Sequence, residues 1–114
     1  MNIQIYFLKR GFDAQKAERY FKERKIPYTV VDLAKHTLGK RELQSVAGQV
    51  GLKNLIDTSA KEYPSSPIRM LTGPDAIMDM LIRSPKLLRT PIVRNQGKAT
   101  VGYCPEVWDT WIEK

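Results

Sequence analysis

The fold is decided by residues 3–31, IQIYFLKRGFDAQKAERYFKERKIPYTVV. Residues 3–7 are rich in apolar, strand-favouring side chains and predict a short buried strand, and residues 8–12 predict a tight loop. Residues 13–25 predict an amphipathic helix, and after a proline residues 28–31 predict a second strand. Strand, helix and strand within about 30 residues indicate a βαβ unit with parallel strands and a right-handed crossover.

The first helix has a clear start and a clear apolar face. Asp13 is a good N-cap residue, so we expect the helix to begin there. Ala17, Tyr20 and Phe21 recur at helical spacing, and the stem of Arg24 can cover apolar surface beside them. The N-terminus of this helix, with its positive dipole end, therefore faces the loop after the first strand.

The middle of the chain is predicted to be helical. Residues 40–50 form a second helix that ends at Gly51, and residues 52–56 extend or restart it briefly. Residues 57–67 are the most loop-like region, and another helix opens at Pro74. The apolar face of that helix is expected to contain Ile77, Met80 and Leu81.

The C-terminal part predicts a hairpin and a closing helix. Residues 91–95 and 99–103 are two strands joined by an Asn-Gln-Gly turn. The last helix starts at Cys104-Pro105, and its expected apolar face is formed by Val107, Trp108, Trp111 and Ile112. The whole order gives an α/β fold, a four-stranded mixed sheet flanked by helices in the thioredoxin-like arrangement. We expect a single domain over residues 1–114 with a helical insertion at about residues 37–84.

Composition limits the classes of protein and site. A chain of 114 residues with 42% hydrophobic content can bury one core. It has no apolar run long enough for a membrane span and no signal-peptide pattern at its start, so we expect a cytoplasmic protein. Cys104 is the only cysteine, which excludes an internal disulfide, and the single His36 is expected at the surface. No nucleotide-binding or metal-binding motif is present, so we predict no nucleotide or metal cofactor.

The net charge of +7 is concentrated in one region. From Lys9 to Lys25 seven basic residues stand against three acidic ones, which gives this segment +4 of the total. Such a basic face fits an acidic protein partner, or it is a solvated helix surface with i,i+4 pairs such as Glu18 with Lys22. Nucleic acid is the least favoured partner, because aromatic residues are not interleaved with the charges in a stacking pattern.

Several segments together resemble one family, at the correct order and distances over nearly the whole chain. They are Phe12–Phe21 with Ile26-Pro27-Tyr28, then Leu87-Leu88-Arg89-Thr90-Pro91-Ile92-Val93, and Val101-Gly102-Tyr103. In this combination the sequence resembles the arsenate reductase (ArsC) family and its relatives, the Spx transcriptional regulators. The resemblance implies a thioredoxin-like fold with a mostly helical insertion. It also implies a cis peptide bond before Pro91, with the backbone of Thr90 across from the active-site loop.

The departures from the family pattern concern its reactive groups. By this resemblance the family's reactive cysteine falls on Gly11, and the second cysteine of the C-x-x-C form falls on Ala14. The three arginines expected to hold an arsenic oxyanion fall near Asp57, Thr90 and Tyr103, none of which is arginine. A glycine cannot supply the low-pKa thiolate that arsenate reduction needs.

The resemblance therefore defines a candidate site without its nucleophile. Lys9 and Arg10 are expected to supply positive potential, Gly11 and Ala14 mark the vacated cysteine positions, and Thr90 is expected to offer backbone hydrogen bonds to a bound thiol peptide. Two further residues of the expected ligand-binding set, Arg89 and Pro91, flank Thr90.

Two hypotheses of function follow. The first is a redox-inactive binding or regulatory protein. Spx-type relatives dock on the RNA polymerase α subunit, and Gly51 with Leu55-Ile56 resembles their docking segment. The alternative is a thiol-dependent, arsenate reductase-like oxidoreductase that uses glutathione as co-substrate, or another external thiol, with Cys104 as a peripheral candidate. In that hypothesis a helix N-terminus lowers the pKa of the Cys104 thiol; otherwise Cys104 is a small inert residue at a helix start.

Overall fold

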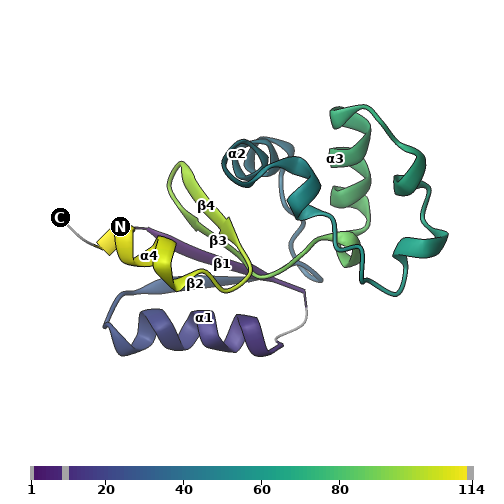
Figure 1. The fold of residues 1–114 in the computed structure, drawn as a ribbon. Coiled ribbons are helices and arrows are strands. Elements are labelled where there is room, and N and C mark those ends of the chain that lie inside the picture. Colours follow the sequence, from purple (N-terminus) through teal and green to yellow (C-terminus); the bar gives the residue numbers. More distant parts are fainter. Residues whose placement is uncertain (1, 9–10, 113–114) are drawn as a thin grey trace.

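A computed structural model describes residues 2–8 and 11–112 and places one mixed sheet at the centre of the chain (Figure 1). The strands are β1 (Ile3–Phe7), β2 (Tyr28–Asp32), β3 (Ile92–Asn95) and β4 (Lys98–Val101), in the spatial order β2-β1-β3-β4. β1 and β2 are parallel, whereas β3 is antiparallel to both β1 and β4. The predicted βαβ unit and the predicted hairpin are therefore confirmed.

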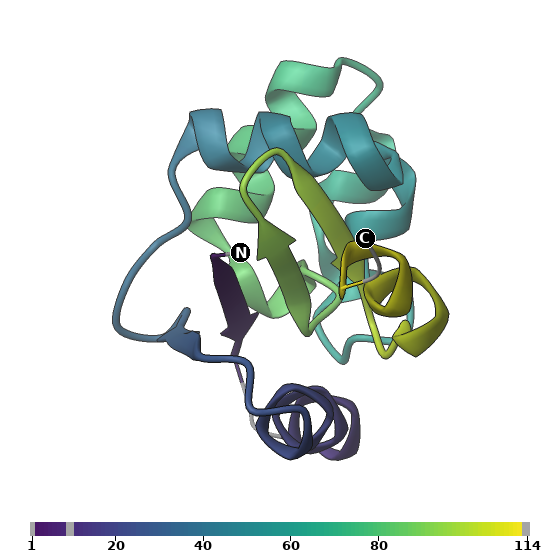
Figure 2. The same cartoon turned by 90° about the vertical axis from the view of Figure 1, so that its left-hand side faces the viewer.

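Helices cover both faces of this sheet (Figures 1 and 2). α1 (Phe12–Glu23) and α4 (Pro105–Ile112) lie on one face, and α2 (Lys40–Val50) lies on the other with α3 (Pro74–Arg83) beyond it. The segment between β2 and β3 contains α2, α3 and short 3-10 turns. The 3-10 turns of the described chain are Leu52–Leu55, Tyr63–Ser65, Pro67–Met70 and Pro85–Leu87.

The alternation along β1 divides the core into two clusters. Ile3 and Ile5 point to the α1 and α4 side, where Phe21 and Trp108 are fully buried. Tyr6 points to the opposite side and packs with the cluster under α2 and α3. One sheet with a buried cluster on each face fixes the positions of the loops at its edges.

The start of α1 differs from the prediction. Gly11 is the N-cap residue, with extended backbone angles and no side-chain cap, and Asp13 is in the first helical turn. The predicted N-cap role of Asp13 is therefore wrong, although a carboxylate in the first turn still interacts favourably with the helix dipole. The helix also ends earlier than expected, at Glu23, and Lys25 takes a φ of +57°.

One predicted apolar face is partly wrong. Val107 is 41% exposed, because Trp108 is the residue of α4 that enters the core. The predicted face of α3 is confirmed, because Leu81 is buried and the half-buried Ile77 and Met80 pack against the same core cluster. Met78 is a further buried residue of α3 that the prediction did not include.

The second helix and its end are confirmed. α2 spans Lys40–Val50 as predicted, and Gly51 closes it with a φ of +88°, a conformation that glycine adopts without strain. None of the helices in the described ranges combines the length and apolar character needed to cross a membrane.

Candidate functional site

A groove lies where the start of α1 meets the start of β3. The two segments meet because β1 and β3 are antiparallel neighbours, with Tyr6 opposite Ile92, so the chain leaving β1 lies beside the chain entering β3. The groove has a volume of about 330 Å³. Its lining residues are Gly11, Phe12, Asp13, Ala14, Thr90 and Pro91.

Gly11 lies in this groove with open space around it. Its backbone is extended, at φ −89° and ψ −169°, which any residue can adopt. A Cβ atom built at Gly11 meets no heavy atom within 4 Å. Ala14, three residues later, also lines the groove but is only 2% exposed. The structure therefore has room for a side chain at position 11.

The wall of the groove opposite the start of α1 is formed by Thr90 and Pro91. The peptide bond between Thr90 and Pro91 is cis, as the resemblance implied. Pro91 is buried and its carbonyl oxygen accepts a hydrogen bond from the Gly102 N–H, whereas the Thr90 N–H and C=O bond to no other described residue. The backbone of Thr90 thus presents a donor and an acceptor that no other described residue uses, in the same groove as Gly11. Its predicted role in binding a thiol peptide stays a prediction.

Of the three charged residues predicted for the site, only Arg89 lies within the described residues. Lys9 and Arg10 lie outside the described residues. Arg89 is exposed and does not line the groove; its backbone N–H donates to the Leu55 carbonyl oxygen at 2.8 Å. The groove instead has Asp13 on its wall, a carboxylate that the sequence reasoning placed at the N-cap and not in the site.

Phe12 is the other lining residue that the sequence reasoning missed. Its side chain is 83% exposed, an unusual position for a phenylalanine. The sequence feature that could have identified Phe12 and Asp13 is their position in the first turn of the helix that follows the predicted site loop.

Tyr103 and Lys16 lie together outside the groove, where both line a separate pocket. Lys16 Nζ is 5.6 Å from the centre of the Tyr103 ring, a cation–π contact, and Tyr103 is 42% exposed. Asp57, another position where the resemblance expects an arginine, accepts hydrogen bonds from the Ser59 N–H and hydroxyl. These two positions therefore carry an aromatic ring and a turn-forming carboxylate.

Cys104 does not line the groove, and its environment differs from the expectation. Its thiol donates to the Val101 carbonyl oxygen at 3.3 Å. Burial raises the pKa of the Cys104 thiol, and the carboxylates of Glu106 and Asp13 raise it further. The expected lowering by the helix N-terminus is wrong, because burial and two negative charges act in the opposite direction.

The sequence model of the ArsC family matches residues 11–111 of this chain. The chain belongs to the ArsC family. Solved structures agree: an arsenate reductase from Vibrio cholerae has a TM-score of 0.82 at 21% identity, with 94% of each chain covered. A candidate arsenate reductase from Yersinia pestis has a TM-score of 0.81 at 26% identity, covering 95% of this chain and 98% of the other.

A third similar structure is the YffB (PA3664) protein, with a TM-score of 0.85 at 14% identity over 97% of this chain and 99% of the other. Among curated proteins no sequence matches the chain. The ArsC resemblance and the thioredoxin-like fold, a four-stranded mixed sheet flanked by helices, are both confirmed.

Two other predicted positions of this ArsC-family chain can be placed. His36 is exposed, as expected. Gly51 is exposed at the end of α2, but Leu55 is fully buried and Ile56 pairs with Leu88 in a β-bridge. The Leu55 side chain is therefore not available to a docking partner. No group of three or more His, Cys, Asp and Glu side chains in the described ranges is arranged to hold a metal ion.

Proposed function

We propose that this chain is a redox-silent member of the ArsC family that binds a partner in the groove between the start of α1 and the Thr90–Pro91 bond. The observation that carries the proposal is a formed groove whose six lining residues contain no sulfur atom. Reduction of arsenate or a disulfide by the usual route needs a thiolate at the attacking position.

The resemblance assigns the family's reactive cysteine to Gly11 and the second cysteine to Ala14. Gly11 cannot act as a nucleophile, and Ala14 is buried. The backbone around both is unstrained, and the groove is open beside Gly11. These features support a site that kept its shape after the reactive atom was lost.

The charge in the groove also argues against an oxyanion substrate. A helix N-terminus attracts anions, but the Asp13 carboxylate already lies in the first turn of α1 and on the groove wall. Two negative groups within a few ångströms repel each other, and the described lining contains no cation to offset them. A neutral or peptide-like ligand fits this environment better than arsenate.

The groove offers contacts suited to an extended peptide. The backbone N–H and C=O of Thr90 bond to no other residue in the described ranges, so they can pair with the backbone of a ligand as a strand edge does. Phe12 adds an exposed aromatic surface beside them. Backbone pairing with one apolar anchor is a common arrangement for peptide recognition.

The reductase hypothesis based on Cys104 is not favoured. A thiol whose pKa is raised has little thiolate at neutral pH, and the Cys104 thiol is held by the Val101 carbonyl oxygen outside the groove. Docking of an RNA polymerase α subunit remains a prediction from the resemblance, and the burial of Leu55 counts against that route.

The test uses S-methylglutathione, a small peptide that cannot exchange a thiol. Added to the ¹⁵N-labelled protein, it should shift the amide signals of residues 11–14 and Thr90 with a dissociation constant on the order of 1 mM, the weak range expected for a tripeptide. Gly11→Leu fills the groove and should remove these shifts. Gly73→Leu is the matched control, because Gly73 is the N-cap of α3 and also has open space around it.

Two results contradict the proposal. The first is the absence of shifts at residues 11–14 at saturating peptide. The second is rapid formation of a mixed disulfide between Cys104 and oxidised glutathione at neutral pH, seen as a mass increase, because a redox-silent protein should not react.

A further inference from the structure

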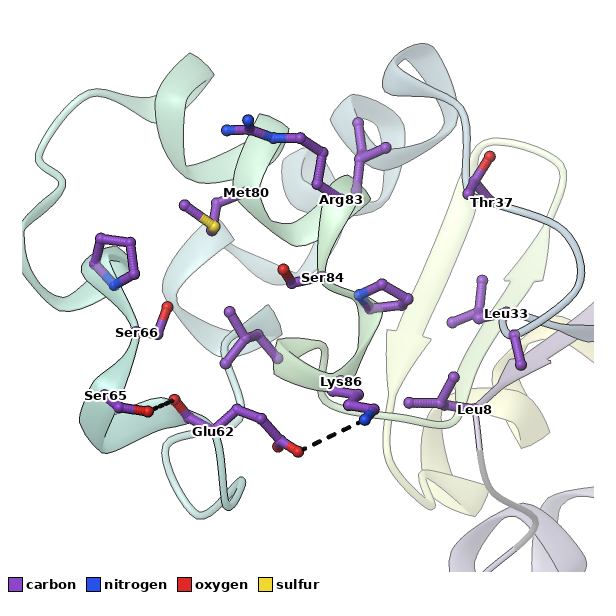
Figure 3. Close-up of a pocket in the computed structure, with 15 residues that line it drawn as sticks. Leu8, Leu33, Thr37, Glu62, Ser65, Ser66, Met80, Arg83, Ser84 and Lys86 are labelled. Carbon is purple, nitrogen blue, oxygen red and sulfur yellow. Dashed lines mark hydrogen bonds and ion pairs between the residues drawn. The ribbon is translucent and has the colours of Figure 1, made fainter.

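A second and larger cavity, with a volume of about 740 Å³, lies between the ends of β1 and β2 and the end of α3 (Figure 3). It shares no lining residue with the groove described above. One wall is Leu8, directly after β1, and Leu33 and Ala34, directly after β2. The other wall is the end of α3 with the turn that follows it, and the 3-10 segments near Glu62.

This position is one where α/β proteins commonly bind ligands. The cavity is outside the carboxyl ends of the parallel strands β1 and β2, where connections leave the sheet in different directions. Its volume is in the range of about 300–1,000 Å³ that small-molecule sites occupy.

The surface of the cavity is largely apolar. Among its lining residues Leu33 and Leu87 are buried, and Leu8, Met80 and Ile82 are half-buried. Transfer of an apolar group from water onto such a surface is favourable. The body of a ligand that fits here is therefore apolar.

The described residues on the rim of the cavity include two basic side chains, Arg83 and Lys86, and one acidic side chain, Glu62. Lys86 Nζ and Glu62 Oε1 form an ion pair at 4.0 Å, which cancels their charges. Arg83 also lines the cavity and has no ion pair with another described residue, and the neighbouring Ser84 hydroxyl has no hydrogen bond within the described ranges. Figure 3 shows Arg83 and the Glu62–Lys86 pair at opposite ends of the cavity, with Ser84 between them.

We propose that this cavity binds a small amphiphilic acid, with its apolar body against Leu33, Met80 and Leu87 and its anionic group at Arg83 and Ser84. Among the described residues of the rim, Arg83 carries a positive charge that no ion pair offsets, and this charge supplies the complementarity. A guanidinium is well suited to a carboxylate or sulfonate. A longer apolar segment of a partner protein is the competing occupant, and the test separates the two.

The probe is 1-anilinonaphthalene-8-sulfonate, an apolar ring system with one anionic group, whose fluorescence rises on binding. Ala34 is exposed on the cavity wall, so Ala34→Phe blocks the space without disturbing the core. This variant should weaken probe binding at least about tenfold, and octanoate should displace the probe from the unmodified protein. Ala76→Phe is the matched control, because Ala76 is exposed on α3 and does not line the cavity.

The contribution of the charge is measured with Arg83→Gln. Loss of a charge-assisted hydrogen bond at a partly exposed site should weaken binding of the sulfonate probe about three- to tenfold. The uncharged analogue N-phenyl-1-naphthylamine should bind equally to both proteins. Arg41→Gln, an exposed change on α2 away from the cavity, should alter neither.

Three results overturn the proposal. They are unchanged probe binding to Ala34→Phe with native circular dichroism, equal loss in Ala76→Phe, and failure of octanoate to compete. The last result, with probe binding intact, indicates the apolar partner segment instead.

Discussion

Restoring a thiol at position 11 is the sharpest test of the site's geometry. The variant Gly11→Cys, in a Cys104→Ser background, places a single sulfur at the N-cap of α1. Because a Cβ at Gly11 meets nothing within 4 Å and φ is −89°, we expect the fold to accept it. The free energy of unfolding should change by less than about 1 kcal/mol, as is usual for N-cap changes that do not remove a side-chain hydrogen bond.

The expected pKa follows from two opposing charges. A helix N-terminus stabilises an anion by about 0.3–2 kcal/mol, equivalent to roughly 0.2–1.5 pKa units below the ordinary value near 8.5. The Asp13 carboxylate in the same turn cancels part of this effect. We therefore expect the pKa of the new thiol to be about 7.5–8.

The assay is the rate of iodoacetamide alkylation as a function of pH, followed by mass spectrometry. The midpoint for Gly11→Cys should lie below that of Cys104 in the unmodified protein, because burial raises the pKa of the Cys104 thiol above its ordinary value. Cys104→Ser alone should not be alkylated. A midpoint at or above about 8.5 for Gly11→Cys would refute the reasoning, because the helix end would then provide no net stabilisation of an anion in the groove.

Three further predictions concern stability. Trp108→Phe removes the indole N–H bond to the buried Thr100 hydroxyl and should cost about 1–3 kcal/mol in urea unfolding; adding Thr100→Val should recover part of that loss, and strict additivity would contradict the pairing. Gly51→Ala, at φ +88°, should destabilise by about 1–2 kcal/mol, whereas Gly48→Ala inside α2 should stabilise by up to about 1 kcal/mol, and equal effects would be inconsistent with the helix end described. Burial and a hydrogen bond to a carboxylate raise the pKa of Tyr20 to about 12. The stabilisation by the neutral Tyr20 hydroxyl is therefore complete below pH 10 and is lost as the pH rises toward 12. Over that pH range the midpoint temperature of unfolding should fall less for Tyr20→Phe than for the unmodified protein.

The architecture could be predicted because local patterns and global packing agree. The parallel β1–β2 unit follows from two apolar strands around one amphipathic helix, and the range of α2 follows from its apolar spacing and the glycine after it. The cis bond before Pro91 came from the resemblance, since the dipeptide alone does not specify it.

The errors have a common physical cause, which is that chain neighbours do not specify three-dimensional surroundings. Aspartate is a residue type that N-cap positions favour, but the helix starts one residue before Asp13, at Phe12, with Gly11 as the N-cap. Val107 fits an apolar spacing, but it is exposed, whereas Trp108 of α4 is fully buried and Trp111 and Ile112 pack beside the same cluster. Cys104 is close to a helix start in sequence, yet burial and two carboxylates determine its pKa.

The larger cavity could not be predicted from the sequence. Its walls come from four separate segments, and no local motif links them. These segments are the residue after β1, the residues after β2, the 3-10 segments near Glu62, and the end of α3 with the turn that follows it. The resemblance placed Gly11 and Thr90 across from each other, and both line one groove in the structure; their role as a site stays a prediction. The presence of Phe12 and Asp13 in the lining of this groove required the structure.

The central claim, that the ArsC-family site of this chain carries no thiol chemistry, is tested most directly by turnover. Purified protein and Cys104→Ser are each incubated with arsenate, or with a disulfide substrate, in the presence of glutathione, and product is measured over time. The account predicts rates for both proteins equal to the uncatalysed reaction. Turnover by the unmodified protein at an ordinary enzymatic rate, on the order of 1 s⁻¹ or faster, would contradict it.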